Sequence, residues 1–349
     1  MSSESTTDQV SRVPGVSVPG PAEAAQGRAP RRPLVRAAGY VLALALLALL
    51  AHLAVGNWRA VSAYPWHVQP ALLAASCVCL MAGRCILPWG VRWVLRLFGE
   101  EVPLRSCWRA YALSQFAKYV PGGVWLFLAR TYLYRRCGVA YAAGGIAVVL
   151  EQVLVVAGSL VVFLGALPWF PWPGHSRWLW ACVAAAVLVA ALVHPRVVSW
   201  AYNLVSRRTG AETERVQVGY RGILSLLGVY VGFWAATGLA FCLLAAALTS
   251  LPASLWPAAG GMFAGACGLG FLVVVAPAGL GVREGSLAGL LSLVYPLPVA
   301  VALALASRLW WFVIDVAFSA ASLGILALVE AGRPAAKHAW EEKPAGGRA

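Results

Sequence analysis

The sequence predicts an all-α polytopic membrane protein with about six full spans and two re-entrant helical hairpins, eight or so membrane segments in all. Hydrophobic residues make up 61% of the 349 residues, charged residues only 11%, and the mean hydropathy is +0.76. Soluble domains carry roughly 25% charged residues. Six apolar stretches are long enough to cross a hydrocarbon core of roughly 30 Å. Two further apolar regions are interrupted by proline and glycine.

In chain order, residues 1–33 predict a disordered cytoplasmic tail, since they are rich in Ser, Thr, Pro, Gly and Ala. Residues 34–330 form the predicted transmembrane domain, and 331–349 form a cytoplasmic C-terminal tail. The predicted full spans are 36–56, 70–88, 141–167, 178–194, 222–250 and 298–329. The interrupted regions, 105–136 and 257–296, are the predicted hairpins.

Basic residues define the predicted orientation. They gather at the end of the N-terminal tail and in the predicted loops 89–105 and 195–221, whereas 57–69 and 168–177 hold one arginine each. If each interrupted region returns to the face it left, every basic loop and both termini lie in the cytoplasm, as the positive-inside rule requires. Two short spans in place of each hairpin give the same parity, so that alternative stays open.

The tip of the first predicted hairpin is KYVPGGVW, residues 118–125. A Pro-Gly-Gly break leaves backbone groups unpaired, which a membrane tolerates only where protein buries them or water reaches them. The second tip, VVVAPAGLGVREG at 273–285, has the same arrangement, and an odd number of spans separates the two. Broken helices in inverted halves indicate a midplane transport site, although a kink or a surface loop is the alternative. The predicted hairpin-forming residues are Pro121, Gly122, Gly123, Pro277, Gly279 and Gly281.

Charged residues within the apolar stretches form the candidate substrate-binding site. They are Lys118, Arg130, Glu151, Arg283, Glu284, Arg308 and Asp315. A charge at a helix centre costs about 2.5–3.5 kcal/mol, so these residues should pair or face a wet cavity. We expect Arg130 to pair with Glu151, and Asp315 with Arg283. Arginine suits a lipid phosphate, because its forked donors match phosphate oxygens; structural ion pairs are the alternative.

Three stretches resemble the lysylphosphatidylglycerol synthase transmembrane region, the flippase-like domain of the multiple peptide resistance factor proteins. They are QFAKYVPGGVWLFLAR, EQVL and APAGLGVREG, and the resemblance covers roughly 36–330. It implies a polytopic inner-membrane protein with re-entrant helices around a central cavity. The best-known members move aminoacylated phosphatidylglycerol between leaflets, and relatives are linked to glycolipid and polyprenyl-linked sugar pathways. The matching positions are Lys118, Pro121, Gly122, Gly123, Arg130, Glu151, Pro277, Gly279, Gly281, Arg283 and Glu284.

Two departures from the family limit what the resemblance implies. Gln152 follows Glu151 where many relatives carry arginine, which weakens the transfer of a particular substrate. The cytosolic aminoacyltransferase domain of the full synthases has no counterpart after the last predicted span. We therefore expect a stand-alone member that does not make lysylphosphatidylglycerol by itself.

These observations favour a lipid translocator, not an enzyme, in the cell membrane. Its expected partners are anionic or zwitterionic phospholipids or polyprenyl-linked lipids, with a separate lipid-modifying enzyme as a further partner. The alternative function is a non-transporting scaffold of such an enzyme. A membrane-embedded glycosyltransferase is less favoured, because the three acids show no DxD spacing.

No cofactor, metal or nucleic acid is expected. The sequence has no GxxxxGK[ST] run, no CxxC pair and no HExxH. The net charge of +14 comes from short loops between apolar runs, where it indicates orientation signals and contact with anionic headgroups.

Overall fold

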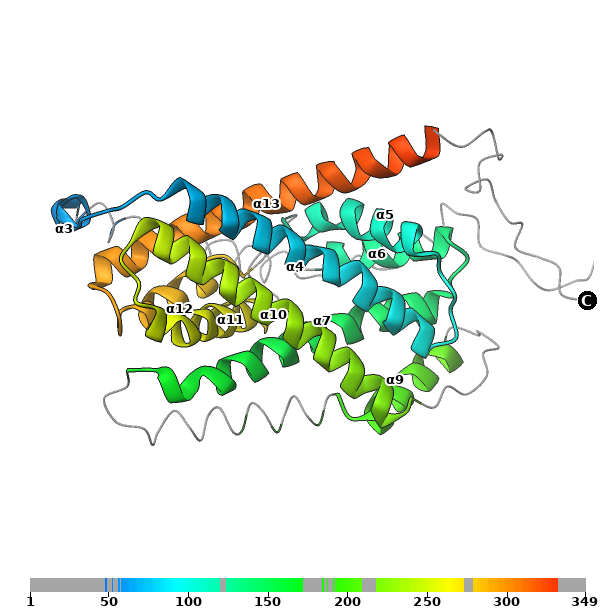
Figure 1. Ribbon diagram of the computed structural model, residues 1–349. Coiled ribbons are helices and arrows are strands. Elements are labelled where there is room, and N and C mark those ends of the chain that lie inside the picture. Colours follow the sequence, from blue (N-terminus) through cyan, green and yellow to red (C-terminus); the bar gives the residue numbers. More distant parts are fainter. Residues whose placement is uncertain are drawn as a thin grey trace, which may run out of the picture.

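The computed structural model describes residues 58–119, 124–171, 193–208, 218–272 and 279–331, with isolated positions elsewhere. Ten α-helices and three short 3-10 helices make up this part of the chain (Figure 1). The α-helices are α3 (Trp58–Ala63), α4 (Pro70–Leu97), α5 (Leu104–Ser114), α6 (Trp125–Arg136), α7 (Tyr141–Ala166), α9 (Pro195–Arg208), α10 (Tyr220–Leu248), α11 (Trp256–Leu272), α12 (Val282–Leu291) and α13 (Leu297–Ala331). The 3-10 helices are η1 (Gln115–Tyr119), η2 (Leu167–Trp169) and η3 (Ala253–Leu255).

Five described stretches are long and apolar enough to cross a membrane. They are Pro70–Leu97, Tyr141–Trp169, Tyr220–Leu248, Ala253–Leu272 and Leu297–Glu330. Helices α4, α7, α10 and α13 confirm the spans predicted at 70–88, 141–167, 222–250 and 298–329. The other two predicted spans, 36–56 and 178–194, fall outside the described residues apart from isolated positions.

Two regions predicted as basic loops are partly helical. Helix α4 continues through Pro88 to Leu97, because Val91, Val94 and Leu95 are buried along one face and hold the last turns against the bundle. Helix α9 occupies much of the predicted loop 195–221. Its Tyr202 is buried and stacks on Phe98, with ring centres 4.8 Å apart. Both helices carry charged residues on their outer faces, and these residues led to the prediction of loops although the inner faces are apolar.

Each interrupted region is a pair of helices on either side of a break. Helices α5 and α6 flank residues 120–123, and α11 and α12 flank residues 273–278, which lie outside the described part of the chain. Helices α5 and α6, with 11 and 12 residues, are each about 17 Å long. Helix α12 has 10 residues, whereas α11 has 17.

Each interrupted region returns to the end of the bundle at which it began, and the two regions do so at opposite ends. For the first, the Ala140 N–H after α6 donates to Glu100 Oε1 before α5, at 3.1 Å. For the second, Thr249 Oγ1 before α11 lies 2.8 Å from the Tyr295 hydroxyl after α12. These contacts lie at opposite ends of the molecule, with α5, α6 and α9 at one end and α3 and α12 at the other (Figure 1).

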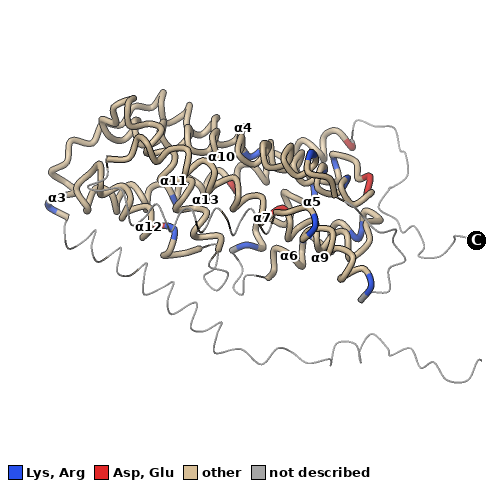
Figure 2. Tube along the Cα trace, turned by 90° about the horizontal axis from the view of Figure 1, so that it is seen from below, with Lys and Arg blue, Asp and Glu red and all other residues tan. Residues whose placement is uncertain are grey.

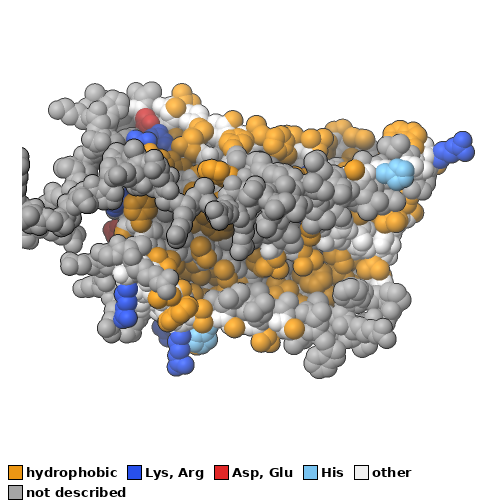
Figure 3. All heavy atoms as spheres, turned by 180° about the vertical axis from the view of Figure 1, so that it is seen from behind, with side chains coloured by type: hydrophobic (Ala, Val, Ile, Leu, Met, Phe, Trp, Pro, Cys, Tyr) orange, Lys and Arg blue, Asp and Glu red, His pale blue; other side chains and the backbone are white. Residues whose placement is uncertain are grey.

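The outer surface matches a lipid-facing bundle. Large apolar side chains of the long helices are exposed, among them Val78, Leu224, Leu309 and Leu328. Where the side chains are described, apolar ones occur from one end of the face in Figure 3 to the other, and charged side chains lie toward its ends. The chain is thus a multi-pass membrane protein.

Candidate functional site

Six charged residues within the bundle meet at one face of α13, and the buried pair of Arg130 with Glu151 lies apart from them. Arg308, Trp311 and Asp315 recur at spacings of three and four residues, which places them on the same side of the helix. The side chains of Trp311 and Asp315 are 3% and 1% exposed. Figure 2 shows charged residues among the helices as well as at the basic end. Helices α4, η1 and α12 bring further charged side chains to this face.

Asp315 holds two cations from different elements. Arg84 Nη2 of α4 lies 2.6 Å from Asp315 Oδ1, and Lys118 Nζ of η1 lies 2.5 Å from Oδ2. The predicted pair of Asp315 with Arg283 is therefore wrong. Arg84 was not among the predicted site residues, although an arginine within the apolar run 70–88 is itself a signal of a buried partner.

Arg283 is stacked on aromatic rings instead. Its Cζ lies 4.3 Å from the centre of the Trp311 ring and 5.1 Å from that of Phe263. Arg283 is 6% exposed, and its Nη2 has no hydrogen-bond partner among the described residues. Arg84 Cζ lies 4.1 Å from the same Trp311 ring. One indole thus contacts two guanidinium groups.

Glu284 stabilises the start of α12 and joins it to α13. Its Oε1 lies 3.2 Å from Arg308 Nη1, and its Oε2 accepts a hydrogen bond from the Gly281 N–H at 2.7 Å. This second contact satisfies a backbone donor that the start of α12 would otherwise leave unpaired. Glu284 therefore fixes where α12 begins, and with it the position of Arg283.

The turn before α12 requires glycine. Gly279 and Gly281 have backbone φ values of +67° and +81°, which residues other than glycine rarely adopt. A Cβ on Gly279 would also lie 2.6 Å from the Gly270 carbonyl oxygen of α11. The other predicted hairpin-forming residues, Pro121, Gly122, Gly123 and Pro277, lie outside the described residues.

The predicted pair of Arg130 with Glu151 is confirmed. Arg130 Nη1 lies 2.5 Å from Glu151 Oε2, and both side chains are 1% exposed. Arg130 Nε also donates to Ser114 Oγ at 2.9 Å, and its Cζ lies 4.2 Å from the centre of the Tyr111 ring. Through these contacts Arg130 joins its own helix, α6, to α5 and α7.

The contacts described above include all seven predicted site residues and also Arg84. Five cations and three carboxylates are brought together inside the bundle, an excess of two positive charges when all are ionised. Such an excess favours an anion. Among the described residues, no group of three or more His, Cys, Asp or Glu side chains is arranged to hold a metal ion.

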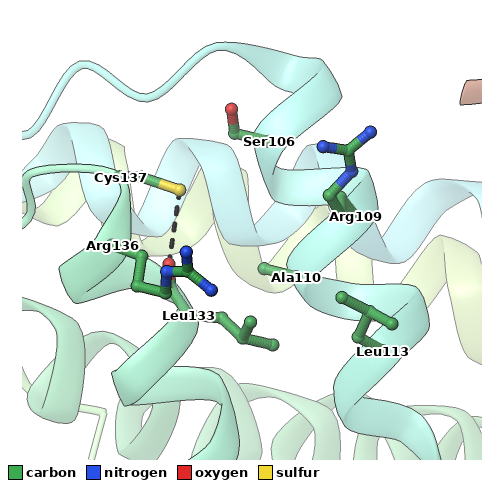
Figure 4. A pocket seen from close by; sticks show the side chains of 7 residues that line it. All are labelled: Ser106, Arg109, Ala110, Leu113, Leu133, Arg136 and Cys137. Carbon is green, nitrogen blue, oxygen red and sulfur yellow. Dashed lines mark hydrogen bonds between the residues drawn. The ribbon is translucent and has the colours of Figure 1, made fainter. Parts of the chain in front are cut away.

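Two pockets open elsewhere on the bundle. One, of about 190 Å³, lies between α5 and α6 (Figure 4), and one of about 380 Å³ is bounded by α7, α10 and α11. Neither is lined by the buried charges around α13.

Comparison with protein families gives one match over most of the chain. Residues 36–319 match the family described as the lysylphosphatidylglycerol synthase TM region. The matched range contains every charged residue of the cluster around α13. Comparison with curated proteins gives no match.

Proposed function

Because the chain belongs to the lysylphosphatidylglycerol synthase TM region family, we propose that it is a lipid translocator. Its buried cations would bind the headgroup of a phospholipid or a polyprenyl-linked lipid and pass it between leaflets. The observation that carries the proposal is Arg283, buried with an Nη2 that no described residue accepts. A buried donor without an acceptor is costly, and a phosphate oxygen would supply the missing acceptor.

The charged residues have different proposed roles. Arg283 is the principal headgroup ligand, and Arg84, Lys118 and Arg308 are the flanking cations. Asp315 and Glu284 orient those cations through their ion pairs. Arg130 and Glu151 hold α6 against α7 and do not contact the headgroup in this scheme.

The two interrupted regions are the proposed moving parts. We propose that both are re-entrant hairpins. Helices α5, α6 and α12 are each about half as long as the hydrocarbon core is thick. Helix α11 with η3 is long enough to cross, so the second hairpin would have arms of unequal length. Lys118 precedes the first break and Arg283 follows the second, and both contact α13. Hairpins based at opposite ends of the bundle would expose this shared site to each leaflet in turn.

Transport, not chemistry, is the proposed activity. Each of the three buried carboxylates is engaged by a cation, Glu151 by Arg130, Glu284 by Arg308 and Asp315 by Arg84. A general base requires a carboxylate that can reach a substrate proton. We also propose the cell membrane as the location, with the arginine-rich end of the bundle in the cytoplasm.

The ion pairs also support a second candidate role. Arg130–Glu151 and Arg308–Glu284 join different helices, as pairs that only stabilise a bundle would do. The chain would then be a non-transporting partner of a separate lipid-modifying enzyme. This role requires no headgroup at Arg283.

A translocation assay separates the two roles. The full chain is reconstituted into vesicles with headgroup-labelled lipids, including phosphatidylglycerol and a polyprenyl phosphate, and the exposure of inner-leaflet label is timed. Wild type should expose the label, and Arg283→Gln should slow exposure at least about tenfold, since a charge-assisted hydrogen bond contributes about 1.5–3 kcal/mol. The control is Arg196→Gln, an exposed arginine on α9, which should match wild type.

The outcomes are distinct. Equal rates for wild type and Arg283→Gln would contradict the headgroup role of Arg283. If wild type moved no lipid of the panel, the partner role would take precedence, and co-purification with a lipid-modifying enzyme would be the next measurement.

A further inference from the structure

A pocket at the basic end of the bundle lies apart from the buried charges. It opens between α5 and α6 and holds about 190 Å³ (Figure 4). Its lining residues are Ser106, Arg109, Ala110, Leu113, Leu133, Arg136 and Cys137. None of these belongs to the proposed translocation site, so the pocket needs its own explanation.

Charged and apolar side chains occupy different parts of this pocket. Arg109 of α5 and Arg136 of α6 flank it, and Leu113 and Leu133 line the side away from Ser106 (Figure 4). Helix α5 begins at Leu104, so Leu113 lies about 14 Å further along its axis, toward the middle of the bundle. A phospholipid has the same order, with its phosphate at the interface and its acyl chains deeper.

The two arginines differ in what holds them. Arg136 is exposed and forms no ion pair with a described residue. Arg109 Nη2 lies 2.5 Å from Glu330 Oε1 near the end of α13, with the two side chains 22% and 45% exposed. Exposed ion pairs contribute little to stability, so a lipid phosphate can displace Glu330 at little cost.

We infer that this pocket binds one anionic phospholipid. Its phosphate lies between Arg109 and Arg136, and an acyl chain lies along Leu113 and Leu133. Glu330 competes with the phosphate for Arg109, so lipid binding loosens the contact between α5 and the end of α13. The inference does not depend on transport, because a lipid bound here need not cross the membrane.

The test measures how many phosphatidylglycerol and phosphatidylcholine molecules the full chain retains in detergent, by native mass spectrometry. Wild type should retain phosphatidylglycerol in preference to phosphatidylcholine. Arg136→Gln should lower that preference about fivefold, since one basic residue near a membrane surface contributes about 1 kcal/mol. Glu330→Gln should raise it, and Arg196→Gln, an exposed arginine outside the pocket, should leave it unchanged.

Two results would overturn the inference. One is an Arg136→Gln variant with the phosphatidylglycerol preference of Arg196→Gln. The other is an equal rise in melting temperature with inorganic phosphate and with phosphatidylglycerol, which would indicate a site for free anions. Arg136→Gln should expose inner-leaflet label at the wild-type rate in the vesicle assay, because Arg136 lines this pocket and not the proposed translocation site, so failure of the translocator proposal and failure of this inference give different results.

Discussion

Arg283 and Trp311 form a cation–π contact, with the guanidinium carbon 4.3 Å from the indole centre. Arg84 approaches the same ring to 4.1 Å, so two positive groups from different helices share one aromatic side chain. Asp315 compensates the charge of Arg84, whereas no described carboxylate pairs with Arg283. An anion at this position would therefore be most stabilising beside Arg283.

Replacing Trp311 should weaken the fold and the proposed site together. Trp311→Leu removes a ring that two buried guanidinium groups contact, and such contacts contribute about 2 kcal/mol each when desolvated. We expect unfolding free energy to fall by about 2–4 kcal/mol, and Trp311→Phe to lose less because it keeps an aromatic face. Thermal unfolding in detergent measures both. Equal losses in the two variants would show that ring volume, not the cation–π contact, is what matters.

Arg84→Gln should be destabilising. It removes one of the two cations that contact Asp315, and because Lys118 remains, the loss should be smaller than the about 3–5 kcal/mol that leaving a buried charge uncompensated costs. The double variant Arg84→Gln with Asp315→Asn should lose less than the sum of the two single variants, because the second change removes a contact that the first has already broken. A double-mutant cycle by thermal unfolding gives the coupling between the two residues. Strictly additive effects would mean that the 2.6 Å pair contributes nothing to stability.

The same substitution should lower stability far more at Arg130 than at Arg283. Arg130→Gln breaks a buried pair with Glu151 and should lower stability by about 3–5 kcal/mol. Arg283→Gln should stay within about 1 kcal/mol of wild type, because the lost cation–π contact is offset by removal of a buried charge without a carboxylate partner. Melting temperatures and translocation rates of both variants check this. If Arg283→Gln were the less stable variant, Arg283 would be a structural residue.

Gly279 should not tolerate a side chain. Gly279→Ala would place a methyl group 2.6 Å from the Gly270 oxygen at a φ of +67°. The left-handed conformation alone costs about 1–2 kcal/mol for a residue other than glycine. Gly285→Ala on α12 is the matched control, since a Cβ there meets nothing within 4 Å, and it should be neutral or stabilising. The yield of folded protein and its melting temperature distinguish the variants, and equal behaviour would refute the turn constraint.

Hydropathy and length suffice to predict α4, α7, α10 and α13, because a spanning helix must be apolar over its whole length. The pair Arg130–Glu151 was also predictable, since the two residues lie in consecutive apolar stretches with one acid in reach. The partners of Asp315 were not. Lys118 and Asp315 are 197 positions apart, and only tertiary packing brings them together. Arg84 was not predicted because the residues around it are apolar. The last turns of α4 were not predicted because they contain arginines.

The contacts that join the two ends of each interrupted region, Glu100 with Ala140 and Thr249 with Tyr295, also limit how those regions can move. Each region also contacts α13, the first through Lys118 with Asp315 and the second through Glu284 with Arg308. If the two regions are the proposed hairpins, sliding along their own axes would break the contacts at their bases, whereas a tilt about the base would break the contacts with α13 first. Because both ion pairs involve α13, a tilt of one region would alter the surroundings of the other through that helix.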